Sequence, residues 1–80
     1  MLHVRCFASV REELGFGELE LPLPGQQATV ADVLRALEER TGKSLAGRHL
    51  LAAVNMTHAQ PSQPVRDGDE VAFFPPVTGG

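Results

Sequence analysis

Apolar and polar residues alternate along much of the chain with a period of two, which is the pattern of half-buried β-strands. The alternation is cleanest over residues 17–23, where three leucines share one parity and two glutamates the other. Residues 50–54 are apolar throughout, which suits a central strand covered by a helix. The predicted strands are residues 2–8, 17–23, 50–54, 58–60 and 71–74.

Residues 29–42 carry the strongest helical signal in the chain. Thr29 and Asp32 fit a capping box, in which two side chains satisfy free backbone N–H groups of the first turn. Gly42 follows the last turn, where a glycine in the left-handed conformation ends many helices. The predicted buried stripe of this helix consists of Val33, Leu34 and Leu37.

A second helical segment, of one or two turns, follows the first strand. Ser9 is its predicted N-cap, and Gly15 closes its end. Val10 and Leu14 stand four residues apart and share one side of the segment. Arg11 belongs to a run of charged residues that faces either solvent or a partner.

The elements follow the order β-β-α-β-(β)-β. The long helix must cover one face of a mixed four- to five-stranded sheet, because no other element can bury that face. Too few residues remain for a second layer, so we expect the other face to be open to water. This α+β arrangement is the β-grasp, or ubiquitin-like, fold. We assign residues 1–74 to the domain and residues 75–80 to a flexible C-terminal arm that ends in two glycines.

The last strand can be oriented from its own residues. Glu70 and Phe74 share one parity, while Val71 and Phe73 share the other. Because an unpaired glutamate belongs in water, Val71 and Phe73 should face the helix and Phe74 the open face. An exposed phenylalanine at the root of the arm is a candidate docking anchor, since aromatic residues dominate interface hot spots. The alternative is a register bulge that buries both rings.

Composition and charge exclude several classes of function. The net charge is −3, whereas nucleic-acid binding needs a basic face. No apolar run approaches the roughly 18–20 residues of a membrane-spanning helix, and the N-terminal residues lack the layout of a signal peptide. A single cysteine allows no internal disulfide, and Cys6 lies on the core parity, where free cysteine usually acts as a small buried hydrophobe. We expect a cytoplasmic protein that binds neither nucleic acid nor membrane.

The chain carries no motif of a self-contained enzyme. His3, His49 and His58 have no metal-ligand spacing with one another or with Cys6, so we predict no metal site. Phosphate-binding loops and nucleophile elbows are also absent from the sequence. The remaining unusual group is the carboxylate of Gly80, displayed on an unhindered glycine.

The arm suits chemistry at its end. Pro75 and Pro76 hold it near the extended polyproline II conformation, which lowers the entropy lost on insertion into another protein. From Pro75 to Gly80 it reaches on the order of 20 Å. The carboxylate is ionised at pH 7, and condensation with ATP would convert it into an acyl-adenylate that accepts sulfur, nitrogen or oxygen. The predicted inserting residues are Pro75, Pro76, Val77, Thr78 and Gly79.

Nearly the whole chain resembles the small subunits of molybdopterin synthases, which carry sulfur in molybdenum cofactor biosynthesis. The most specific match is Asp67-Gly68-Asp69-Glu70-Val71-Ala72-Phe73-Phe74-Pro75-Pro76-Val77-Thr78-Gly79-Gly80. Further matches are residues 4–8 with Phe7, the pair Arg11-Glu12, and residues 51–55. A terminal Gly-Gly alone would indicate only the wider group of ubiquitin-like carriers.

The resemblance implies a cycle of reactions at Gly80. An E1-like adenylating enzyme activates the carboxylate with ATP, and a sulfur donor enzyme converts the adenylate into a thiocarboxylate. The arm then enters the large synthase subunit, where sulfur passes to cyclic pyranopterin monophosphate. The two subunits form a heterotetramer in which the large subunit supplies the catalytic side chains, so this chain is not catalytic alone and holds no tightly bound cofactor.

The resemblance also implies that Phe74, Phe7, Arg11 and position 58 contact the partner. An aliphatic residue is expected at position 58, so His58 departs from the pattern. Three other readings stay open: the sulfur carrier of thiamine thiazole synthesis, which is typically shorter and lacks the Phe-Phe-Pro-Pro-Val run, a protein modifier that forms isopeptide bonds through Gly80, and a plain interaction domain.

Overall fold

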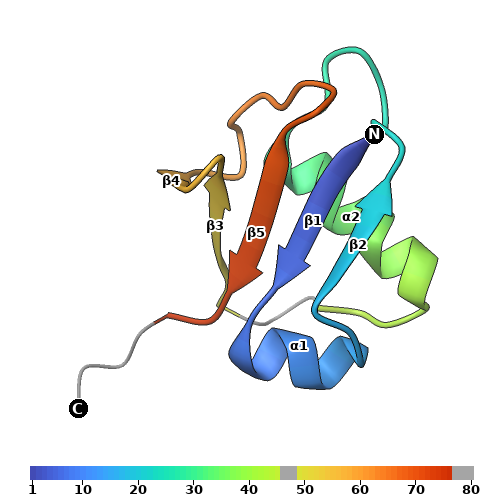
Figure 1. The fold of residues 1–80 in the computed structure, drawn as a ribbon, viewed down its shortest axis with the longest axis vertical. Coiled ribbons are helices and arrows are strands. Elements are labelled where there is room, and N and C mark those ends of the chain that lie inside the picture. The colour runs from blue at the N-terminus through green and yellow to red at the C-terminus, as the bar shows by residue number, and fades with distance from the viewer. Residues whose placement is uncertain (46–48, 77–80) are drawn as a thin grey trace.

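The computed structural model describes residues 1–45 and 49–76 of the chain. Within these residues, five strands form one mixed sheet in the order β2-β1-β5-β3-β4, and the longer helix crosses one of its faces (Figure 1). This confirms the predicted α+β, β-grasp architecture. The elements are β1 Leu2–Cys6, α1 Ala8–Leu14, β2 Glu18–Leu21, α2 Val30–Thr41, β3 Leu51–Val54, β4 Thr57–Ala59 and β5 Glu70–Phe74.

The two ends of the domain meet at the centre of the sheet. Strand β1 pairs antiparallel with β2 and parallel with β5, and β5 pairs antiparallel with β3. Val4 lies opposite Val71, and Cys6 lies opposite Phe73. These four side chains are between 0% and 1% exposed, so the parallel register brings the apolar parity of both strands to the helix side.

The start and end of α2 are as predicted. Thr29 is the N-cap, and it exchanges both capping-box hydrogen bonds with Asp32. Gly42 takes the left-handed conformation with φ 72°, and its N–H donates to the carbonyl of Glu38. These hydrogen bonds to Thr29 lower the pKa of the Asp32 carboxyl, because they favour its charged form.

The buried stripe of α2 needs one correction. Val30, Val33 and Leu37 are buried, whereas Leu34, which we predicted in the stripe, is half-buried. Leu34 packs against the margin of the core and lines a groove between α2 and the strands β3 and β4. The sheet narrows at that edge to the three residues of β4, so no strand covers the outer side of Leu34.

The predicted cap of α1 is wrong. The helix begins at Ala8, and its N-cap is Phe7, which makes no side-chain capping bond; Ser9 lies inside the first turn. The N–H of Phe7 donates to the carbonyl of Phe73 over 3.1 Å, while the carbonyl of Phe7 accepts from Val10 and Arg11. Strand pairing therefore sets the start of this helix, and β1 ends at Cys6 rather than at residue 8 as predicted.

The other strands are one to three residues shorter than the predicted ranges or shifted by one residue. Strand β2 ends at Leu21, directly before Pro22, which has no N–H for the ladder. The return strand β4 forms after a turn in which Asn55 and Met56 have positive φ, at 50° and 70°. No helix among the described residues is long and apolar enough to span a bilayer.

Candidate interaction surface at the root of the arm

The face of the sheet opposite α2, called here the open face, carries the predicted docking residues. In β5, Phe73 is buried on the helix side, and Phe74, on the other side, is half-buried. The pairing of β5 with β3 runs without a break from Val71 to Phe74, so no bulge buries both rings. The open face carries Glu18, Glu20, His3, Arg5, Glu70, Ala72, Phe74, Leu51, Ala53 and His58.

His58 is a direct neighbour of Phe74. The pairing places His58 opposite Ala53, and Ala53 opposite Ala72, so two alanines leave room between larger side chains. The imidazole meets the Phe74 ring edge-on, with centroids 5.7 Å apart and an interplanar angle of 85°. An edge-to-face contact of this kind holds both rings in defined positions. The position that departs from the expected aliphatic type therefore lies beside the predicted anchor.

Phe7 lies at the same end of the sheet as Phe74. Its ring is 40% exposed, and the guanidinium carbon of Arg5 stands 5.2 Å from the ring centroid. The hydrogen bond from the Phe7 N–H to the Phe73 carbonyl joins its backbone to the strand that leads into the arm. Two partly exposed aromatic rings thus flank the point where the chain leaves the sheet.

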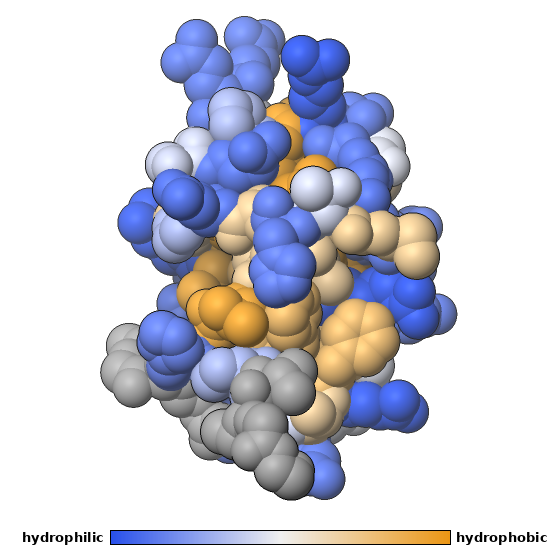
Figure 2. Space-filling view, turned by 90° about the vertical axis from the view of Figure 1, so that its left-hand side faces the viewer, coloured by the Kyte–Doolittle hydropathy of each residue, from blue (hydrophilic) through white to orange (hydrophobic). Residues whose placement is uncertain are grey.

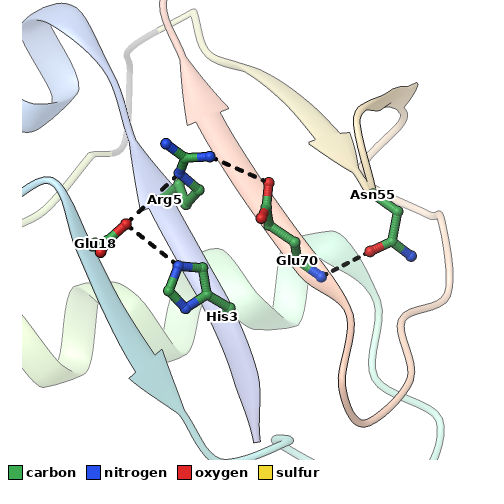
Figure 3. A network of polar contacts seen from close by, with 5 residues as sticks. All are labelled: His3, Arg5, Glu18, Asn55 and Glu70. Carbon is green, nitrogen blue, oxygen red and sulfur yellow. Dashed lines mark hydrogen bonds and ion pairs between the residues drawn. The ribbon is translucent and has the colours of Figure 1, made fainter.

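Charged residues cover the other half of the open face (Figure 3). Arg5 lies 3.8 Å from Glu18 and 3.7 Å from Glu70, and His3 lies 3.4 Å from Glu18. All of these side chains are at least one-third exposed, so each pair adds at most about 1 kcal/mol to stability. The network nevertheless fixes Arg5 between three strands, and Arg5 in turn stacks on Phe7.

Asn55 ties the β3–β4 turn to the start of β5. Its side-chain oxygen accepts from the Glu70 N–H, and its amide donates to Asp69, both over 3.0 Å (Figure 3). The bond from Asn55 is the main reason why the pKa of Asp69 is lowered, and the Arg66 N–H adds to it. Asp67 contacts the N-terminal amino group. Both aspartates therefore act as turn formers, as we predicted.

Arg11 lies in a cleft of about 300 Å³ between α1 and β2, with Phe7 on its wall. Arg11 itself is exposed. Cys6 also borders the cleft, but its side chain is only 1% exposed, and burial raises the pKa of its thiol to about 11. Such a thiol stays protonated at neutral pH, which agrees with the predicted structural role.

The arm begins at this end of the molecule, next to α1 (Figure 1). Pro75 and Pro76 are half-buried. The remaining predicted arm residues, Val77, Thr78, Gly79 and Gly80, lie outside the described residues. Among the described residues, no group of three or more histidine, cysteine or acidic side chains is placed to hold a metal ion.

An apolar groove of about 370 Å³ lies on the other side of the β3–β4 edge, between α2 and the sheet. Leu34, Leu50, Ala59 and Pro61 are among its lining residues. Figure 2, which views the molecule from this edge, shows apolar side chains gathered between hydrophilic margins. None of the residues predicted to bind a partner lines this groove.

Sequence and structure comparisons agree on one family. The model of the ThiS family matches residues 4–80. The chain is 44% identical to the molybdopterin synthase sulfur carrier subunit of Escherichia coli and 40% identical to that of Haemophilus influenzae, in alignments that cover 100% of each chain. A crystal structure of the small archaeal modifier protein 1 of H. volcanii superposes with a TM-score of 0.79 at 27% identity, covering 95% of this chain and 97% of the other.

Proposed function

The chain belongs to the ThiS family, and from this premise we infer that it is the sulfur carrier subunit of a molybdopterin synthase. The observation that carries the inference is the 44% identity to a sulfur carrier subunit over the full length of both chains. The family alone fits several sulfur carriers, whereas both full-length relatives are carriers of this one synthase. The open face, with two aromatic rings at the root of the arm, supports a role that depends on docking.

In the proposed cycle, the Gly80 carboxylate attacks the α-phosphate of ATP in the site of an E1-like enzyme. Pyrophosphate leaves, and an acyl-adenylate remains. A sulfur donor enzyme supplies a sulfur nucleophile that adds to the acyl carbon and displaces AMP, which leaves a thiocarboxylate. The thiocarboxylate then delivers its sulfur to cyclic pyranopterin monophosphate. Because this cycle consumes ATP, the proposal places the chain in the cytoplasm.

The partner of the proposed transfer step is the large synthase subunit, since the full-length relatives are named as subunits of a synthase. Phe74 and Phe7 serve as anchors, His58 packs beside Phe74, and Arg11 lies next to Phe7. With the body docked through these residues, the arm from Pro75 to Gly80 enters the catalytic site of the partner. Two copies of each subunit assemble into a heterotetramer.

Intact-mass spectrometry tests the chemistry. The purified full chain is incubated with the adenylating enzyme, ATP and a sulfur source, and the mass is followed with and without ATP. A gain equal to the replacement of one oxygen by sulfur supports the carrier. Addition of the large subunit and the pterin precursor should then return the original mass and yield molybdopterin. A chain that gains sulfur but never yields molybdopterin with that subunit would contradict the assignment to this synthase.

Protein modification is the second candidate function, favoured by the likeness to the archaeal modifier. It uses the same adenylate but ends in an isopeptide bond between Gly80 and a lysine. Tryptic peptides of cell proteins that carry a remnant of this arm would support it. If such conjugates are absent while sulfur transfer proceeds, the carrier function stands alone.

A further inference from the structure

Gly17 is a glycine that the backbone does not require. Gly15, Gly42 and Gly68 have positive φ angles of 83°, 72° and 91°, which side chains rarely adopt. Gly17 has no such angle, so other residues could take its conformation. Its place at the start of β2 also disfavours glycine, because glycine weakens strands. The reason for a glycine must therefore lie in the space around its Cα atom.

That space is occupied by the Arg11 side chain. A Cβ atom added at Gly17 would lie 3.2 Å from both Cζ and Nε of Arg11 and 3.4 Å from Nη1. The near-equal distances show that the flat face of the guanidinium lies against Gly17. Guanidinium N–H groups point outward in the plane of the group, so this packing leaves its edges open to an acceptor.

Two arginines line the cleft beside Phe7, and they differ in their partners. Arg5 is already bound to Glu18 and Glu70. In the part of the chain that the structure describes, no carboxylate forms an ion pair with Arg11. A protein that covers Phe7 would remove water from Arg11, and burial of an unpaired charge is costly. Binding is therefore favoured only when the partner brings an anionic group to this cleft.

We propose that Gly17 is a positioning residue that holds the Arg11 guanidinium flat at the edge of the docking surface, where it receives a carboxylate side chain of the docking partner. The carboxylate accepts two parallel N–H bonds from the open edge of the guanidinium. The inference rests on the proposed function, because it takes the large synthase subunit as the partner that covers Phe7. It adds a residue, Gly17, that touches neither the arm nor the partner's chemistry.

The test measures affinity for the large subunit by titration calorimetry at two salt concentrations. Arg11→Ala should weaken binding about tenfold and reduce its salt dependence, since a charged pair is lost. Gly17→Val should weaken binding about fivefold by displacing the guanidinium, and it should have almost no effect in an Arg11→Ala background. Gly17→Ala, whose Cβ shifts the guanidinium only slightly, should lie between wild type and Gly17→Val.

Gly25→Val is the matched control, because a Cβ at Gly25 would meet nothing within 4 Å and its φ is not left-handed. This variant should bind like the wild type. The Arg11 Nε–Hε resonance should shift in the NMR spectra of both free Gly17 variants, which separates a moved guanidinium from a damaged fold. If Gly17→Val binds normally, or its loss is fully additive with that of Arg11→Ala, the proposal is wrong. If the wild-type chain itself does not bind the subunit, the proposed function fails instead.

Discussion

Replacing each of the two neighbouring phenylalanines of β5 tests the orientation of the open face. Phe73 is 1% exposed and belongs to the core, whereas Phe74 is half-buried on the other side of the sheet. Phe73→Ala should therefore lower stability severely and Phe74→Ala only mildly. The reverse order holds for partner binding, where Phe74 is the anchor and Phe73 touches nothing outside the core.

The magnitudes follow from the two environments. Truncation of a buried phenylalanine leaves a cavity and costs about 3–5 kcal/mol. A domain of this length has a free energy of unfolding of roughly 4–12 kcal/mol, so Phe73→Ala removes a large part of it. Phe74 loses part of its buried area and the edge contact with His58, together about 1–2 kcal/mol.

Urea unfolding followed by far-UV circular dichroism measures both changes, because the chain has no tryptophan or tyrosine to serve as a fluorescent probe. Binding to the large subunit is then measured for Phe74→Ala at a temperature where it stays folded. We expect a loss of affinity of at least about tenfold, typical of an aromatic hot spot. Equal destabilisation by the two substitutions, or unchanged affinity of Phe74→Ala, would refute the orientation and the anchor respectively.

Three further predictions concern single side chains. His58→Leu should tighten binding to the large subunit by about threefold to tenfold, because the imidazole nitrogens need partners once covered and a leucine does not; calorimetry against wild type checks this, and weaker binding would contradict it. Asp69→Asn should flatten the loss of stability in acid: the Asp69 pKa is lowered in the folded state, so its stabilisation is present at neutral pH and disappears as pH falls below about 4. Urea midpoints at several pH values show whether the wild-type slope in this window is steeper than that of the variant. Cys6 should react with iodoacetamide at neutral pH only on unfolding, since it is 1% exposed and its thiol pKa is raised to about 11; rapid labelling of the folded chain would count against this.

Local signals in the sequence were sufficient for part of the fold. The capping box of Thr29 and Asp32 and the glycine after α2 depend on residues within one helical turn, so they could be predicted without tertiary information. The start of α1 could not, because the hydrogen bond from Phe7 to Phe73 comes from the far end of the chain. Leu34 fits the helical period, but its exposure depends on how far the sheet extends beneath it.

The candidate surface shows the same division. Parity alone placed Phe74 opposite Phe73, because side chains alternate along any strand. The contact between His58 and Phe74 depends on the register of β3 with both β4 and β5, which the sequence does not fix. The contact between Arg11 and Gly17 joins a helix to the strand that follows it, and a glycine of ordinary φ gives no sequence signal of such packing.

The central claim is that Gly80 carries the sulfur. The most direct measurement compares the full chain with a variant that lacks Gly80, in an assay that contains the adenylating enzyme, ATP, a sulfur source, the large subunit and the pterin precursor. The account predicts that the shortened chain folds and unfolds like the wild type, gains no sulfur by intact mass and yields no molybdopterin. A chain that ends at Gly79 and still supports turnover would contradict the claim.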